Sequence, residues 1–129
     1  MKSLIAMTFI ILGINLWSTL SVASPQACKY ISEGAVQQSW KKIRIQILNG
    51  VILTGADSFS EAINLGKSLL DGQICFPHLQ DCRLASEGIV GGVIMKQRIQ
   101  MDGEMVFGAE DMATALNELS QLRSLGFCK

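Results

Sequence analysis

The sequence predicts an all-α domain of four helices, made of two tandem αα-hairpins that are each closed by a disulfide. Three observations favour this fold. Two segments of the chain match each other, each segment begins and ends at a cysteine, and the apolar residues in its second part recur at helical spacing. The alternative is an α+β domain with short β-hairpins at Asn49-Gly50 and Asp102-Gly103, because Asn-Gly between apolar runs is a strong hairpin signal.

The N-terminal residues have the composition of a secretory signal peptide. Lys2 supplies one positive charge before an apolar run that extends from Leu4 to Leu20. The run ends in Ser21-Val22-Ala23, whose small residues signal peptidase accepts. An uncleaved anchor is the other interpretation, but the run is short and interrupted. We therefore predict a signal peptide over 1–23 and one small periplasmic or secreted domain over 24–129, with no membrane segment after cleavage.

Two long segments of the chain match each other. The matched ranges are 28–47 with 82–101 and, once Leu48 is skipped, 49–75 with 102–128. Of the 47 aligned pairs, 16 are identical. We infer a tandem duplication, with repeat one over 28–75 and repeat two over 82–128. The one length difference lies beside the shared Asn/Asp-Gly, and a deletion is tolerated at a corner better than inside a helix or strand.

Helical spacing follows this corner in both segments. Steps of three and four residues connect Ile52, Ala56, Phe59, Ile63, Gly66 and Leu70, and also Met105, Ala109, Met112, Leu116 and Leu119. Asn49 and Asp102 are then predicted to be helix N-caps. A later start at Ser58, with Glu61 completing a capping box, would leave room for a short hairpin before the helix. Before the corner, the helical prediction rests on Val36, Trp40, Ile43 and Ile47.

The four cysteines are expected to form two disulfides, as in other small exported domains. Antiparallel helices of equal length bring the start of the first beside the end of the second. This geometry favours the pairs Cys28–Cys75 and Cys82–Cys128, whereas the local pair Cys75–Cys82 is sterically allowed but breaks the repeat. A linker over 76–81 would join the two hairpins, and Asp81 would cap the third helix.

No catalytic or metal-binding signature is present in the chain. His78 is the only histidine and lies in the linker, which excludes a cluster of histidine ligands. The carboxylate pairs Asp102/Glu104 and Glu110/Asp111 are interpreted as helix caps or first-turn residues. The eleven basic and eleven acidic side chains balance, so nothing favours a nucleic acid partner. We therefore expect no enzyme activity and no cofactor or metal.

One polar pattern recurs in both segments and is the predicted partner-binding surface. Its residues are Lys42, Arg44 and Gln46 in the first segment and Lys96, Arg98 and Gln100 in the second. The alternative is an ordinary solvated face. The hypothesis of a docking surface requires a protein partner, and a homodimer is left open.

Several short motifs resemble the Rap/Tai family of type VI secretion immunity proteins. They are Cys28-Lys-Tyr30-Ile31 with Gly34, Ile74-Cys75-Phe76-Pro77, and Gly126-Phe127-Cys128. The resemblance implies a periplasmic dimer that binds a cell-wall-cleaving amidase toxin and blocks its active site. The sequence departs from the family in the spacing around Tyr30 and Gly34, in the absence of a proline before Cys128, and in the presence of Cys82.

The predicted function is therefore that of an exported, non-enzymatic binding protein, with immunity against a cell-wall-targeting toxin as the specific hypothesis. The alternative is a periplasmic chaperone or secretion accessory protein, which would use exposed apolar faces.

Overall fold

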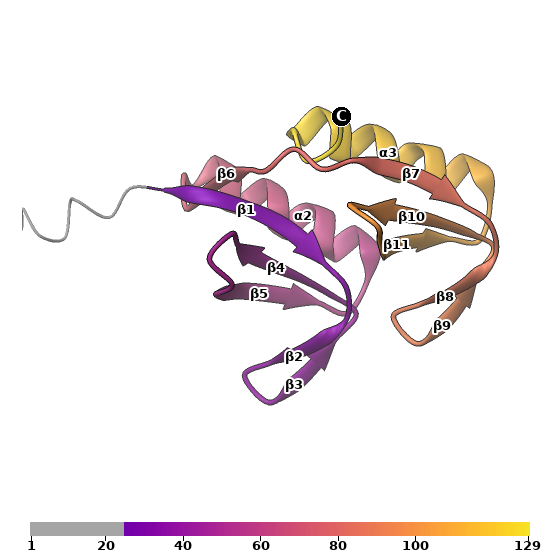
Figure 1. Ribbon diagram of the computed structural model, residues 1–129, viewed down its shortest axis with the longest axis horizontal. Coiled ribbons are helices and arrows are strands. Elements are labelled where there is room, and N and C mark those ends of the chain that lie inside the picture. The colour runs from indigo at the N-terminus through magenta and orange to yellow at the C-terminus, as the bar shows by residue number, and fades with distance from the viewer. Residues whose placement is uncertain (1–24) are drawn as a thin grey trace, which may run out of the picture.

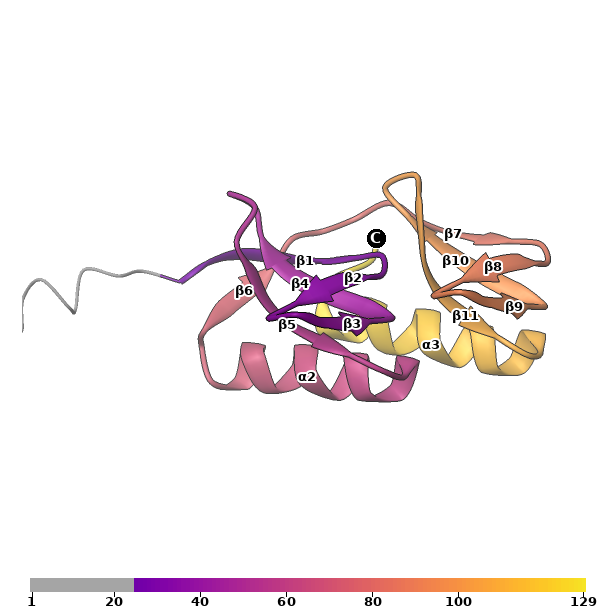
Figure 2. The same cartoon turned by 90° about the horizontal axis from the view of Figure 1, so that it is seen from below.

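The computed structural model describes residues 25–129, and the predicted signal peptide over 1–23 lies outside this range. The molecule has two halves that lie side by side along its longest axis (Figure 1). We call residues 25–77 half one and residues 80–129 half two. Both helices lie on one side of the molecule, and in both views they run in the same direction (Figures 1 and 2).

Each half contains a strand, a small hairpin, two further strands and a helix, in that order. Half one consists of β1 (Gln26–Ile31), β2 (Gly34–Val36), β3 (Ser39–Lys41), β4 (Ile43–Ile47), β5 (Ile52–Ala56), α2 (Phe59–Asp71) and β6 (Cys75–Pro77). Half two consists of β7 (Cys82–Ala85), β8 (Gly88–Val90), β9 (Val93–Met95), β10 (Gln97–Met101), β11 (Glu104–Ala109) and α3 (Met112–Leu125).

Each half builds its own main sheet from these strands. The sheet of half one has the order β5-β4-β1-β6, in which β6 is parallel to β1 and the other pairs are antiparallel. The sheet of half two has the order β11-β10-β7 and is antiparallel throughout. The pairs β2-β3 and β8-β9 form two separate two-stranded hairpins.

Alternation of apolar and polar residues explains the central strands. In β4, Ile43 and Ile45 are buried while Arg44 between them points to the other face, as expected for a period of two. In half two, β10 is joined to β11 by Asp102-Gly103, and both residues have positive φ (52° and 87°). This conformation suits the two-residue hairpin turn that Asp-Gly favours.

The predicted all-α bundle of two repeated helical hairpins is wrong. Residues 25–129 are mostly β with two helices, and neither Asn49 nor Asp102 caps a helix. The helical spacing was misleading because its first members, Ile52 and Ala56, belong to β5 and the following ones to α2. The alternative with hairpins at Asn49-Gly50 and Asp102-Gly103 agrees with the observed strand pairing.

Only the N-cap half of the capping box proposed with this alternative is present at the start of α2, because the Glu61 carboxylate accepts from the Asp57 N–H at 3.4 Å and not from that of Ser58. Ser58 is the N-cap, and its hydroxyl accepts a hydrogen bond from the Glu61 N–H at 3.2 Å. In half two, Asp111 caps α3 in the same way and accepts from the Thr114 N–H at 2.7 Å. The acceptors satisfy backbone donors that the first helical turn leaves free. Asp81 does not cap a helix, because β7 follows it.

The two disulfides join Cys28 to Cys75 and Cys82 to Cys128, the pairing predicted from the sequence. The predicted reason was wrong, since no pair of helix ends is involved. In half one, Gln26 of β1 pairs with Cys75 of β6, which brings Cys28 close to the strand that follows α2. In half two, Gln80 forms the corresponding bridge to Cys128. Each disulfide therefore ties the segment after a helix to the first strand of its half.

One continuous apolar core extends through both halves, and Tyr30 lies where they meet. The Tyr30 ring packs edge-on against Phe107 and Phe127 of half two, with centroid distances of 5.1 and 4.7 Å. The Gln80 side-chain amide accepts from the Tyr30 N–H and donates to the Tyr30 carbonyl, at 3.2 and 3.3 Å. Among residues 25–129 no helix is both long enough and apolar enough to cross a membrane.

Candidate functional site

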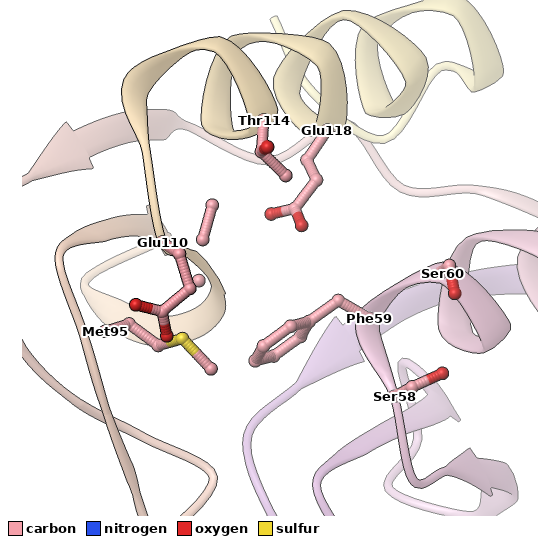
Figure 3. A pocket seen from close by; sticks show the side chains of 9 residues that line it. Ser58, Phe59, Ser60, Met95, Glu110, Thr114 and Glu118 are labelled. Atoms are coloured by element: carbon pink, nitrogen blue, oxygen red, sulfur yellow. The ribbon is translucent and has the colours of Figure 1, made fainter.

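A hollow of about 370 Å³ opens at the junction of the two halves (Figure 3). Half one contributes the start of α2, with Ser58, Phe59 and Ser60. Half two contributes Met95 from β9, the end of β11 and the first turns of α3, including Glu118. The hollow is therefore assembled from both halves.

Glu118 is the unusual group in this hollow. It lies on α3, its residue is only 8% exposed, and its carboxylate points into the hollow (Figure 3). Its Oε1 atom is buried with no hydrogen-bond partner among the residues that the structure describes. Burial raises the pKa of the Glu118 carboxyl to about 7 because an apolar environment disfavours the charged form. Glu118 is therefore readily protonated near neutral pH.

The other walls of the hollow are mainly apolar. The Phe59 ring extends from α2 towards Met95, and the Glu118 carboxylate lies above both of them (Figure 3). Gly108 permits this arrangement, since a Cβ atom on Gly108 would stand 2.7 Å from Met95 Cγ. An apolar hollow with one unpartnered carboxyl suits a ligand group that is partly apolar and carries a hydrogen-bond donor. The ammonium end of a lysine side chain is one such group.

The two small hairpins form a second candidate site. We call β2-β3 and β8-β9 the hairpin arms; they project from the same side of the molecule, away from the helices (Figure 1). Trp40 and Ile94 occupy corresponding positions on the two arms and are each 66% exposed. Ile89 lies directly opposite Ile94 in the second arm and is also exposed. The outer face of both arms is therefore apolar.

The inner face of each arm packs on its own half. A Cβ atom at Gly55 of β5 would stand 2.7 Å from Lys41 Cγ and 3.0 Å from Val36 Cγ2, both on the first arm. Gly108 plays the same role for Met95 of the second arm. The shared Gly-Ala of the two aligned segments thus lets an arm rest on the neighbouring strand. The outer face of each arm remains exposed to solvent.

The two sets of residues in the predicted polar surface lie on β4 and β10 or just before them, in different halves. Two of its members support the main chain of their own half. Arg44 donates to the carbonyls of Ser32 and Glu33 at 3.0 and 3.1 Å, and Arg98 donates to that of Ser86 at 2.7 Å.

The lysines and glutamines of this set differ in their surroundings. Lys42 is half-buried, with its Nζ atom 6.0 Å from the centroid of the Phe59 ring, whereas Lys96 is exposed. Gln46 and Gln100 are half-buried on their strands. A role of these residues in partner binding stays a prediction.

The remaining carboxylates serve different purposes. Asp102 accepts from the Asp81 N–H at 2.8 Å in a hairpin turn, and Glu104 accepts from the Ser32 N–H at 2.8 Å across the junction. Asp111 is a helix cap, as predicted, and its pKa is lowered chiefly by the hydrogen bond from the Thr114 backbone. Glu110 lines the junction hollow, so its predicted role as a cap or first-turn residue is wrong.

Sequence reasoning missed both Glu118 and the hairpin arms. The signal for Glu118 was present in the aligned segments, where Leu65 of the first corresponds to Glu118 of the second. A carboxylate that replaces leucine in a periodic apolar pattern indicates either an exposed position or a buried site with a special role. The signal for the second arm was Gly91-Gly92, whose positive φ values of 61° and 79° form its turn.

Among residues 25–129, no three side chains of the metal-binding types gather into a cluster. Comparisons of the chain with models of protein families, with curated proteins and with solved structures find no match. The two disulfides are consistent with an oxidising compartment outside the cytosol.

Proposed function

We propose that this chain is an exported, non-enzymatic accessory protein that binds polypeptide segments of other proteins through its two hairpin arms. The supporting observation is the exposed apolar outer face of both arms, with Trp40 and Ile94 each 66% exposed. Exposed apolar surface that is repeated at corresponding positions marks a binding surface more often than isolated apolar residues do. A periplasmic chaperone or secretion accessory protein would use such a surface.

The arms suit an extended polypeptide for a geometric reason. Each arm is a two-stranded sheet, so its two strands have edges at which a further strand can form backbone hydrogen bonds. The apolar side chains beside these edges would contact alternate side chains of the bound segment. Two arms on the same side of the molecule allow two such contacts with one unfolded chain, which strengthens binding through effective concentration.

Tryptophan fluorescence tests the role of the first arm directly. Trp40 is the only tryptophan in residues 25–129, since the other is Trp17. Titration with a disulfide-reduced, unfolded reporter protein should shift the Trp40 emission to shorter wavelength as the indole leaves water. The same reporter should aggregate more slowly, as followed by light scattering. An unchanged Trp40 emission at saturating reporter would contradict the proposal.

A matched pair of variants separates the arms from apolar surface in general. W40S/I94S removes one exposed apolar side chain from each arm, and L48S/L79S removes two leucines, each about half exposed, that lie outside the arms. We expect W40S/I94S to need about tenfold more protein for equal suppression of aggregation, which corresponds to about 1.4 kcal/mol of binding. L48S/L79S should behave like the wild type. Equal loss in both variants would mean that the arms have no special role.

Neutralisation of a toxin is the second candidate, and the junction hollow is the observation that favours it. A hollow with one buried carboxyl fits a single side chain of one specific partner, such as a lysine. A toxin encoded beside this gene should then copurify as a stable one-to-one complex, and E118Q should weaken this complex at least tenfold. A stable complex that is indifferent to E118Q would place the contact elsewhere.

A further inference from the structure

The two halves of the chain meet through different surfaces. The leading face belongs to half one and consists of Tyr30, Ser32, Lys42, Phe59 and Ile63. The trailing face belongs to half two and consists of Gln80, Gly91, Glu104, Phe107 and Phe127. Both helices run in the same direction, and both arms project from the same side (Figures 1 and 2). One half is thus related to the other mainly by a translation along the long axis. The two halves therefore meet through two different faces, in a head-to-tail contact.

Each half also carries the counterpart of the face that its neighbour uses. Through the sequence alignment, the counterpart of the leading face in half two is Leu84, Ser86, Lys96, Met112 and Leu116. The counterpart of the trailing face in half one is Gln26, Gln37, Val51, Thr54 and Ile74. We call these the free leading face and the free trailing face. They lie towards opposite ends of the long axis, beside the start of α3 and beside the β4–β5 turn (Figure 1).

The free faces are apolar and exposed at the positions where the junction is buried. Ile63 is 6% exposed at the junction, whereas its counterpart Leu116 is 49% exposed. Phe127 is 0% exposed, whereas its counterpart Ile74 is 56% exposed. Val51, Leu84 and Met112 are likewise exposed large apolar residues. Exposed apolar side chains therefore gather at the two free faces, at positions whose counterparts form the junction.

Gln26 provides an independent polar match. At the junction, the Gln80 amide bonds to both the N–H and the carbonyl of Tyr30, and Gln80 is 1% exposed. Gln26 is also glutamine and occupies the corresponding position, since it pairs with Cys75 as Gln80 pairs with Cys128. Its side chain is exposed. Gln26 could make the same two bonds only to a main chain that lies where Tyr30 lies at the junction.

We propose that a second copy of this chain docks end to end, with its free trailing face against the free leading face of the first. In this arrangement Ile74 of one copy covers Leu84 of the next, as Phe127 covers Tyr30 at the junction, and Thr54 lies against Met112, as Phe107 lies against Phe59. Leu116 faces the last turns of α2 in the other copy, as Ile63 faces the last turns of α3. The Gln26 amide bonds to the main-chain N–H and carbonyl of Leu84. Head-to-tail contacts between identical chains form rings when the rotation closes and open chains when it does not.

The contact between copies is weaker than the junction inside each copy. In the contact between copies, Thr54 takes the place of Phe107 and Val51 that of Glu104. This contact therefore lacks the aromatic cluster of the junction and has no equivalent of the bond from the Ser32 N–H to Glu104. The junction also gains from the covalent linker between the halves, because linked surfaces meet at a high effective concentration. Assembly is therefore reversible and depends on protein concentration. This proposal is independent of the polypeptide-binding function of the arms.

Sedimentation velocity over about 10 μM to 1 mM protein tests this assembly, a range in which weak contacts become populated. The wild type should gain mass with concentration beyond that of a dimer or settle at a closed ring. L116R blocks the free leading face, and V51R blocks the free trailing face. Each variant alone should remain at the mass of one chain. L79R changes an exposed leucine in the linker, outside both faces, and should assemble like the wild type.

Mixing the two blocked variants gives the decisive measurement. L116R retains the free trailing face and V51R retains the free leading face, so an equimolar mixture should form dimers and nothing larger. Circular dichroism of each variant shows that it is folded. A wild type that stays at the mass of one chain up to about 1 mM overturns the proposal. So does a dimer formed by either blocked variant alone, since that would reveal a symmetric contact.

Discussion

The two halves have the same order of strands and helix, yet they fill the position of Tyr30 in different ways. In half one, Tyr30 is fully buried, its hydroxyl donates to the Ala62 carbonyl at 2.7 Å, and Gly66 leaves room for its ring. In half two, the corresponding residues are Leu84, which is exposed, and Leu119, which is buried. A large side chain thus comes from the strand in one half and from the helix in the other.

This difference shows which residues stabilise the junction. A Cβ atom on Gly66 would collide with the Tyr30 hydroxyl, so the tyrosine and the glycine depend on each other. Only half one has a neighbour that covers this position, because Phe107 and Phe127 of half two pack against the Tyr30 ring. The two halves therefore differ at positions that form the junction, whereas they share the strands and turns that determine the fold.

The largest effect is expected when half one is given the residue of half two. Y30L removes the ring contacts to Phe107 and Phe127 and leaves the Ala62 carbonyl without its donor. We expect the free energy of unfolding to fall by about 3 kcal/mol, the sum of a cavity and a lost buried hydrogen bond. Urea denaturation followed by circular dichroism measures this change. The reciprocal variant L84Y should stay within about 0.5 kcal/mol of the wild type, because Leu84 is exposed.

A loss in L84Y as large as that in Y30L would contradict the comparison, since it would mean that both positions support the fold equally. Y30F sharpens it further. This variant keeps the ring and removes only the hydroxyl, so it should cost about 1 kcal/mol.

The fold could be predicted from sequence only in part, and the reasons lie in particular residues. The Asn49-Gly50 and Asp102-Gly103 turns and the Ser58 N-cap depend on local chemistry, and the sequence contained these signals. The cysteine pairing was predicted from the match between the two segments, because the local pair Cys75–Cys82 would break it. The all-α prediction failed at Ile52 and Ala56, whose spacing to Phe59 is helical although a strand ends between them. Spacing alone cannot reveal that boundary.

The candidate sites were harder to predict for a different reason. The apolar face of the arms could not be inferred because Trp40 and Ile94 look like core residues in any periodic pattern. The junction hollow needs the packing of two halves whose residues are distant in the sequence. Glu118 was visible only as an exchange for Leu65, and its burial follows from the contact between the halves rather than from α3 itself.

A second comparison is between Glu118 and its counterpart Leu65. Only Glu118 titrates, so only Glu118 makes the stability depend on pH. The folded-state pKa of Glu118 is about 7, above the ordinary value of 4.5. A group whose pKa rises on folding stabilises the folded state fully below its unfolded pKa, and this stability is lost as pH rises through the folded pKa. We therefore expect the free energy of unfolding to fall by about 2 kcal/mol between pH 5 and 7.

Chemical denaturation at several pH values, performed on the wild type and on E118Q, isolates this contribution because every other titrating group is common to both proteins. E118L should be more stable than the wild type at pH 8 by about 1–3 kcal/mol, since it removes a buried unpartnered oxygen. An equal pH dependence in the wild type and E118Q would show that Glu118 is not buried as described.

The smallest effect is expected at the tips of the arms, where the halves differ in their turn residues. Gln37 and Gln38 have φ values of 49° and 72°, and the corresponding Gly91 and Gly92 have 61° and 79°. Positive φ is costly for glutamine but not for glycine, and hairpin turns of this type favour Asn-Gly. The double variant Q37N/Q38G should therefore raise the free energy of unfolding by about 1 kcal/mol.

The reverse exchange completes the comparison between the arms. G92Q places a glutamine at the second turn position of the second arm, where no backbone atom stands close to the site of its Cβ. It should lower the free energy of unfolding by about 1 kcal/mol because the left-handed conformation is strained for a side chain. Thermal unfolding followed by circular dichroism compares both variants with the wild type. If Q37N/Q38G is no more stable, the first arm does not depend on its turn, and its stability comes from the packing of Val36 and Lys41 over Gly55.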